Sequence, residues 1–335
     1  MNSRRVAREL AKLHLALVLS IKDEEVAKLV KERTVITGGS IVSLLLSEWV
    51  KDYDLYFTDK ETTLRVAEYY VELFKKNRKA LRKQDIKRTS NIELYVTKDN
   101  KRCSKDSDFD RIRIKIPSAG VIGEDSEEEN YGYFESQPDE LGAETYINEA
   151  MREAIQEADA VDGGLLDTYE NSEGELFRPV FLSDNAITLS GKVQIVIRFY
   201  GSPDQIHENF DFVHCTNYWE SRTKQLVLNP AAIESVLTRD LRYVGSKYPV
   251  CSVIRLRRFL KKGWFANAGQ ILKILMQISK LNLEDVGVLD EQLTGVDTAY
   301  FFEMVRILKA EQKKLKKQGK SIDQTYIATI IDRIF

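Results

Sequence analysis

Cysteine, histidine and proline are scarce in this 335-residue chain, which contains three, three and six of them. The cysteines, Cys103, Cys215 and Cys251, are far apart and have no paired spacing. Such scattered cysteines argue against a disulfide scaffold and a cysteine-based zinc site, and they are typical of a reducing cytoplasm. Long apolar runs are also absent, because no stretch of about 18 residues is apolar throughout. The sequence therefore predicts no membrane partner.

The first thirty residues place basic side chains before an apolar stretch, as a signal peptide does. Charged residues interrupt that stretch, however, and no small-residue cleavage site follows it. Leu10, Leu13 and Leu17 recur at helical spacing. We therefore expect residues 1–33 to form N-terminal helices that pack on the core of a cytoplasmic protein.

The formal net charge of −2 hides a strong asymmetry along the chain. Residues 124–175 contain eighteen acidic residues and one basic residue, Arg152, so the remainder carries a net charge near +15. A basic body favours a polyanionic partner. We expect residues 118–175 to form an acidic insertion, with a helix at 145–160 and mobile flanks. It is either a lid that competes with nucleic acid or a solvated loop.

The chain is organised around residues 34–59, TVITGGSIVSLLLSEWVKDYDLYFTD. Its β-branched start and the later run YDLYF predict two strands, and the apolar run between them predicts a helix. Gly38, Gly39 and Ser40 form the turn that precedes this helix. Free N–H groups and the helix dipole favour an anion there, and glycine lets a phosphate approach closely.

Asp52 and Asp54 flank Tyr53 at the start of the second strand. Side chains at i and i+2 of a strand share a face, so the two carboxylates lie together and Tyr53 points the other way. Two neighbouring carboxylates ionise most easily with a divalent cation between them, and oxygen ligands suit Mg²⁺ or Mn²⁺. An Asp-x-Asp alone is usually a solvated strand end, but its spacing from a glycine turn indicates a phosphate-handling site.

The segment GGSIVSLLLSEWVKDYDLYF resembles the signature of the DNA polymerase β-like nucleotidyltransferase superfamily. Its spacing is most similar to that of the head domain of CCA-adding enzymes and bacterial poly(A) polymerases. The family's Arg-Asp pair is replaced by Val42 and Ser43, which weakens an expectation of CTP and ATP selection. The resemblance implies metal ligation by the aspartates and contacts to a nucleoside triphosphate, such as ATP, from the turn and the residue before Asp52. The implied nucleotide-binding residues are Gly38, Gly39, Ser40 and Lys51.

Asp211 stands between two phenylalanines in NFDFVHC. We predict that it lies on a later strand, where polymerase β-like enzymes commonly carry a third carboxylate. It would share a metal ion and help to deprotonate the acceptor, because a carboxylate among aromatic residues is costly unless it is paired or metal-bound. A structural cap or ion pair is the alternative. His214 and Cys215 do not form a nucleophile pair in this interpretation, because neighbours on a strand face opposite ways.

Four further segments, at 92–96, 111–116, 178–182 and 192–200, read as strands, and residues 183–191 suggest a hairpin between the last two. Arg111, Arg113 and Lys115 alternate onto one face, which is either solvated or turned toward substrate. From residue 229 the pattern is helical. The helix that starts at Pro249 has a basic side, where a nucleic-acid or triphosphate contact competes with a solvated face as the interpretation. The candidate contacts are Arg255, Arg258 and Lys262.

The sequence thus predicts an α/β (α+β) fold, a polymerase β-like core with a small mixed sheet, an acidic insertion and an all-α C-terminal region. The expected parts are N-terminal helices (1–33), a first core part (34–117), the insertion (118–175), a second core part (176–228) and a helical domain (229–335).

The predicted function is metal-dependent transfer of a nucleoside monophosphate from a nucleoside triphosphate to an acceptor hydroxyl, first of all an RNA 3′ end such as that of tRNA. Transfer to a small molecule or a protein, and a degenerate binding module, are the alternatives. The segments NFDFVHCTNYW and YPVCSVIRLRRFLKKGW also resemble uncharacterised bacteriophage nucleotidyltransferase-like proteins, which implies a location in the host cytoplasm. The oligomeric state stays open.

Overall fold

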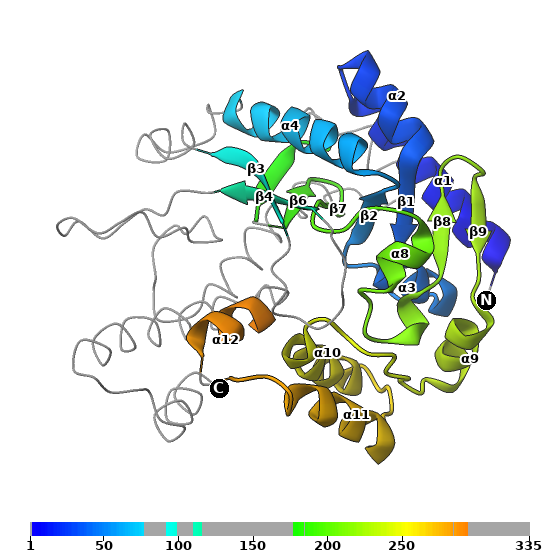
Figure 1. The fold of residues 1–335 in the computed structure, drawn as a ribbon. Helices are drawn as coiled ribbons and strands as arrows, with labels where there is room; N and C mark the ends of the chain where they lie inside the picture. The colour runs from blue at the N-terminus through cyan, green and yellow to red at the C-terminus, as the bar shows by residue number, and fades with distance from the viewer. Residues whose placement is uncertain are drawn as a thin grey trace, which may run out of the picture.

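A seven-stranded mixed sheet forms the centre of the computed structural model, which describes residues 2–76, 92–98, 110–115, 177–183, 185–283 and 285–293 (Figure 1). The strand order is β5-β6-β7-β2-β1-β8-β9. β2 and β7 run parallel, and the other neighbours run antiparallel. The strands of this sheet are β1 (Thr34–Thr37), β2 (Tyr53–Phe57), β5 (Pro179–Leu182), β6 (Ala186–Leu189), β7 (Val193–Val196), β8 (Tyr218–Glu220) and β9 (Gln225–Val227). The predicted α/β class with a mixed sheet is confirmed.

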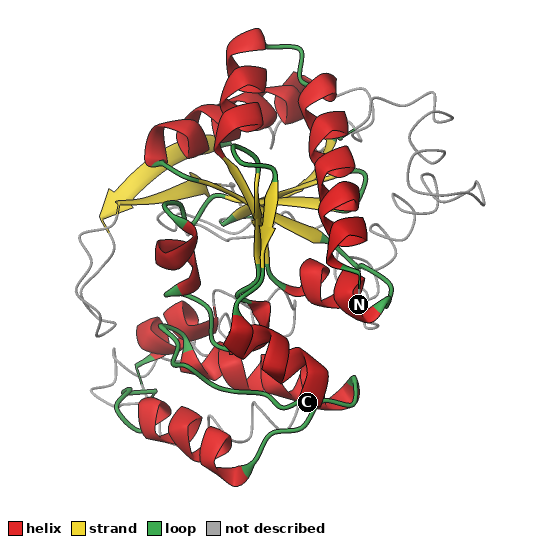
Figure 2. Ribbon diagram, turned by 90° about the vertical axis from the view of Figure 1, so that its right-hand side faces the viewer, coloured by secondary structure: helices red, strands yellow, loops and turns green. Residues whose placement is uncertain are grey.

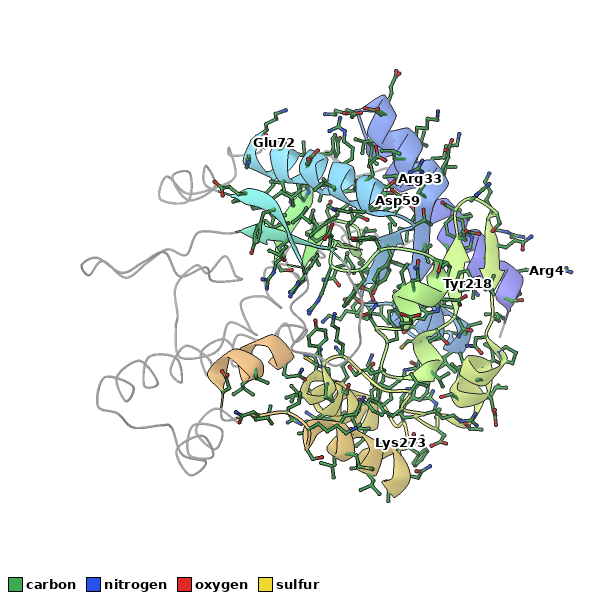
Figure 3. The ribbon with its side chains drawn as sticks, viewed as in Figure 1. Arg4, Arg33, Asp59, Glu72, Tyr218 and Lys273 are labelled. Carbon is green, nitrogen blue, oxygen red and sulfur yellow. The ribbon has the colours of Figure 1, made fainter. Side chains whose placement is uncertain are left out.

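Four helices contribute apolar side chains to the core on one face of the sheet: α1 (Ser3–Ser20), α2 (Glu24–Arg33), α3 (Gly39–Leu46) and α4 (Lys60–Lys76) (Figure 2). Leu10, Leu13 and Leu17 of α1 are fully buried in this core, so the prediction of an N-terminal helix that packs on it is confirmed. Arg33 of α2 forms an ion pair of 3.0 Å with Asp59, whose carboxylate also accepts a hydrogen bond from the first turn of α4 (Figure 3).

The side chains of β2 alternate between the two faces of the sheet. Tyr53, Leu55 and Phe57 are buried in the main core. Tyr56 belongs to a smaller apolar cluster with Val35 and Ile206, the last of which comes from α8 (Pro203–His207). Asp52 and Asp54 therefore share their face with Tyr56, as the strand period predicts.

A helical region follows the sheet and consists of α9 (Pro230–Thr238), α10 (Pro249–Lys261), α11 (Ala268–Ile278) and α12 (Val286–Leu293). It has its own apolar cluster, which includes Leu256, Trp264 and Ile274. The helical pattern from residue 229 suggested one helix over residues 231–246, and this is wrong, because α9 ends at Thr238 and Arg239 adopts a left-handed conformation (φ 53°). None of the described helices has the length and hydropathy of a membrane-spanning segment.

Two predictions for the strands need correction or refinement, and one hairpin was not predicted. Asp211 does not lie on a strand, because it precedes the short 3₁₀ helix η2 (Val213–Cys215), and the strand in this part of the chain is β8. The connection expected over 183–191 contains a strand of its own, β6. The β8–β9 hairpin was not predicted, since each strand has only three residues.

A separate two-stranded sheet consists of β3 (Glu93–Lys98) and β4 (Asp110–Lys115). β4 contains the first five residues of the RIRIKI segment. Ile112 and Ile114 point into the main core. Arg111, on the other side, is buried and donates a hydrogen bond of 2.7 Å to Asn185, so the face is not solvated at that position. The acidic insertion, its predicted helix at 145–160 and the helices predicted beyond residue 293 lie outside the described residues.

Candidate nucleotide-binding site

The glycine turn follows the C-terminal end of β1, and the Asp-x-Asp pair lies at the N-terminal end of β2, the neighbouring central strand. In the antiparallel β1–β2 pairing, Thr37 lies opposite Asp54, so the end of β1 adjoins the start of β2. Gly38 follows Thr37 with φ +92° and ψ −153°, a conformation that only glycine adopts readily. A Cβ atom at Gly38 would lie 3.1 Å from Asp54 Oδ2. The backbone of the turn is thus directly against the carboxylate.

Asp52 and Asp54 are both half-buried, and Asp52 directly precedes the first residue of β2. Their charges act on Tyr56, which is buried on the same face. Burial raises the pKa of Tyr56 most strongly, and the negative charges of Asp54 and Asp52 raise it further. Both carboxylates therefore act on the same buried tyrosine, on one face of β2.

Asp211 joins the same neighbourhood from a different segment. Burial raises the pKa of the Cys215 thiol, and Asp211 and Asp54 both add to that increase. The Cys215 carbonyl also accepts a hydrogen bond of 3.2 Å from the Gly38 amide. Segments more than 150 residues apart in the sequence thus place Asp54 and Asp211 around one point.

The partner of Asp211 is an arginine. Arg255 Nε, on α10, donates to Asp211 Oδ2 at 2.6 Å, and their side chains are 32% and 11% exposed. Burial is the largest single influence on the pKa of Arg255 and lowers it. The charge of Asp211, its hydrogen bond and the nearby cysteines together outweigh burial, so the pKa is raised. The ion-pair alternative raised for Asp211 thus describes this structure. Arg255 points inward, whereas Arg258 and Lys262 are exposed on the same helical segment.

The remaining predicted residues surround the turn at different depths. Gly39 and Lys51 are exposed. Ser40 is buried at the start of α3, and its hydroxyl has no hydrogen-bond partner among the described residues. A buried hydroxyl without a partner is unusual. A phosphate oxygen bound at the first turn of α3 would provide one.

His207, the last residue of α8, contacts the strand that leads into the glycine turn. Its Nε2 lies 2.8 Å from Thr37 Oγ1, and Thr37 donates in turn to the Asn217 carbonyl at 2.8 Å. Since the hydroxyl has one proton, His207 Nε2 carries the proton of the first bond. Burial lowers the pKa of His207 to about 4, so the ring is neutral near pH 7. This contact fixes the residue before the glycine turn, and no sequence pattern signals it.

The carboxylates fit a metal ion only together with a ligand. Among the described residues, no cluster of three or more His, Cys, Asp or Glu side chains is arranged to hold a metal. Asp211 Oδ2 is paired with Arg255, and Asp52 and Asp54 are the two half-buried carboxylates beside the glycine turn. Mg²⁺ is commonly bound by one or two carboxylates plus substrate phosphates. The donor set therefore suits a metal ion that arrives with a nucleotide.

These features define a mixed α/β protein in which a glycine turn lies beside two half-buried aspartates. A family model matches residues 9–239, and the chain belongs to the Gabija anti-defense 2 family. The match runs from α1 through α9, so it includes the glycine turn, both strand aspartates and Asp211, whereas α10 with Arg255 lies beyond it. No curated protein and no solved structure matches the chain.

Proposed function

We propose that the chain is a metal-dependent nucleotidyltransferase that counters Gabija defence. The observation that carries the proposal is the close approach of the Gly38 backbone to the Asp54 carboxylate. It supports the proposal because a glycine turn suited to a phosphate then lies beside two carboxylates suited to a metal ion. Nucleotidyl transfer needs that combination, since positioning and charge neutralisation account for most of its catalysis.

Each residue has a defined part in this proposal. Gly38, Gly39 and Ser40 hold the β- and γ-phosphates, and the Ser40 hydroxyl gains the partner that it lacks. Asp52 and Asp54 hold Mg²⁺ or Mn²⁺, which neutralises the phosphates and the attacking oxygen when it is bound. Lys51 is exposed next to Asp52 and contacts the nucleotide.

Two roles are open to Asp211, and one variant distinguishes between them. It acts as a third carboxylate toward the acceptor hydroxyl if Arg255 releases it, and it anchors α10 if the pair stays closed. Replacing Arg255 with methionine frees Asp211. Faster transfer at lower stability would support the first part, and lower stability with unchanged transfer would support the second.

The acceptor that we favour is an RNA 3′ end, and the basic body of the chain supports this choice. A protein or nucleic acid of the Gabija system is the second candidate, because the family description names that defence. For either acceptor, exposed Arg258 and Lys262 are available to contact phosphates.

The test is incubation of the protein with each α-³²P-labelled nucleoside triphosphate, Mg²⁺ or Mn²⁺, and total cellular RNA and protein. We expect a labelled RNA band that depends on metal. Asp52→Asn and Asp54→Asn should each lower the labelling at least about a hundredfold, as the loss of several kcal/mol of charge stabilisation implies. Glu32→Gln, an exposed site on α2, is the matched control and should label at the wild-type rate.

The label also identifies the acceptor. Label on a protein band would replace RNA with a protein acceptor and keep the reaction. Absence of label on every acceptor, with identical behaviour of wild type and the aspartate variants, would contradict nucleotidyl transfer and leave a binding role.

A further inference from the structure

An arginine outside the proposed nucleotide site has no acidic partner among the residues that the structure describes. Arg198 follows β7 and is only 5% exposed. Its guanidinium makes no hydrogen bond or ion pair with any residue that the structure describes, and Nη2 is fully buried. Its recorded side-chain contacts are aromatic, with the guanidinium carbon 4.1 Å from the ring centre of Tyr248 and 5.2 Å from that of Phe199. A buried and unpaired charge is costly, so a ligand that supplies a counter-charge would stabilise this position.

The nearest helix presents its positive end to the same place. Tyr248 is the N-cap residue of α10, a helix of 13 residues, and its side chain makes no capping hydrogen bond. No acidic residue stands in the first turn of α10. The Tyr248 hydroxyl is also buried without a partner. Two buried donors that have no partner among the described residues therefore lie beside the start of α10. The first turn offers few amides of its own, because Pro249 has no N–H and the Val250 N–H donates to Gln292 Oε1 at 3.5 Å. Its contribution is the positive end of the helix dipole, which favours an anion.

We propose that Arg198, Tyr248 and the first turn of α10 form a binding site for a phosphate group. The planar guanidinium offers several N–H donors in a fork that matches the oxygens of a phosphate, and the Tyr248 ring holds that plane from one side. The Tyr248 hydroxyl adds one more hydrogen-bond donor. The positive end of the α10 dipole adds electrostatic attraction for an anion. This combination selects an oxyanion and disfavours a neutral ligand.

The location separates this site from the glycine turn. Gln194 pairs with Asp54, and Arg198 comes four residues later, at most about 13 Å further along the chain. The phosphate therefore belongs either to a distal part of the nucleotide or to the backbone of a nucleic-acid acceptor. Naming these two sources rests on the proposed function, but phosphate binding itself does not.

Thermal unfolding of the full chain with increasing inorganic phosphate or pyrophosphate, at constant ionic strength, tests the site. We expect the melting temperature of the wild type to rise with ligand, because a ligand that binds only the folded state stabilises it by mass action. Arg198→Met keeps an unbranched apolar side chain but removes the guanidinium group, and it should weaken phosphate binding at least tenfold. Without ligand it should melt no lower than the wild type, because it removes an unpaired buried charge.

Two further variants complete the design. Arg257→Met, at an exposed position on α10, removes the same charge and should bind phosphate like the wild type. Tyr248→Phe keeps the ring under the guanidinium but removes the hydroxyl, and it should weaken binding less than Arg198→Met does. A phosphate response that is equal in wild type and Arg198→Met would overturn the proposal. So would an Arg198→Met protein that melts lower than the wild type while phosphate leaves the wild type unchanged, because Arg198 would then be a packing residue.

Metal-free ATP and a short single-stranded RNA distinguish the source of the phosphate. Loss of ATP affinity in Arg198→Met assigns the site to the nucleotide, and loss of RNA affinity assigns it to the acceptor. The Asp52→Asn and Asp54→Asn variants should keep the response to inorganic phosphate. A wild type that transfers no label but responds to phosphate through Arg198 would contradict the proposed function and support this site.

Discussion

The two faces of strand β2 have different tasks. On one face, Tyr53, Leu55 and Phe57 pack into the main core with α1, α2 and α4. On the other face, Asp52 and Asp54 share their side of the sheet with Tyr56, and Asp54 lies beside the glycine turn.

One strand of five residues thus contributes to stability on one side and to the proposed chemistry on the other. Because successive side chains of a strand point to opposite faces, two adjacent residues of β2 serve different tasks. Substitutions at adjacent positions should therefore have opposite signatures, and this contrast is what the following predictions sharpen or break.

The largest effect on stability is expected on the core face. Leu55 is fully buried, so Leu55→Ala should lower the free energy of unfolding by about 2–5 kcal/mol, as loss of a buried side chain does. Chemical denaturation measures this loss. A decrease below about 1 kcal/mol would show that the core face tolerates a cavity and would weaken the comparison.

The next effect concerns the pair between Asp211 and Arg255. Arg255→Met leaves the buried Asp211 without its partner. We expect a loss of about 2–3 kcal/mol, less than for a fully buried pair because the arginine side chain is 32% exposed. Arg257→Met, exposed on the same helix, is the control and should change stability by less than about 0.5 kcal/mol. Equal effects of the two variants would remove the pair as an anchor of α10.

Gly38→Ala should have a smaller effect, of about 1–3 kcal/mol, because a residue with a side chain is strained at φ +92° and ψ −153°. The new Cβ would also meet Asp54 Oδ2 at 3.1 Å. Gly39→Ala has no atom within 4 Å of the new Cβ and no positive φ, and it should fold with nearly wild-type stability. Similar melting temperatures for the two variants would mean that the turn is not constrained.

The smallest effect at neutral pH is expected for His214→Phe. His214 is buried against Phe259 and Trp264, and neither ring nitrogen has a hydrogen-bond partner among the described residues. Burial lowers its pKa from 6.5 to about 4; the charge of Asp211 opposes this shift and that of Lys262 adds to it.

The sign of the pH dependence follows from that shift. Between pH 6.5 and about 4 the unfolded chain binds a proton at this histidine and the folded chain does not, so its contribution to stability is complete above pH 6.5 and is lost as the pH falls. His214→Phe removes this loss, which is at most about 1.4 kcal/mol per pH unit. Denaturation at pH 7 and pH 5 should show a smaller decrease for the variant. An unchanged decrease would mean that His214 is already protonated at pH 5.

The local pattern of β2 could be predicted from sequence because it depends on adjacent residues. The alternation of Asp52, Tyr53 and Asp54 fixes which side chains share a face, whatever the rest of the chain does. The glycine turn before α3 has the same local origin. These two elements meet because antiparallel pairing of β1 with β2 puts Thr37 opposite Asp54.

The partners of Asp211 and Thr37 could not be predicted, because each comes from a distant segment. Arg255 reaches Asp211 from 44 residues away, and His207 reaches Thr37 from 170 residues away. The strand predicted around Asp211 was wrong for a related reason. Aromatic residues in NFDFVHC suggested a strand, but their rings pack on side chains of other elements and do not mark a strand here. Phe210 contacts Tyr56, Phe212 contacts Phe259 of α10, and His214 contacts Trp264.

The most direct test of the division between the faces is to measure nucleotide transfer and unfolding free energy for Asp54→Asn and Leu55→Ala together. We predict that Asp54→Asn loses at least about a hundredfold in transfer and keeps nearly wild-type stability. Leu55→Ala should lose stability and, under conditions where it is folded, transfer at a rate within a few fold of the wild type. Wild-type transfer by folded Asp54→Asn would contradict the account.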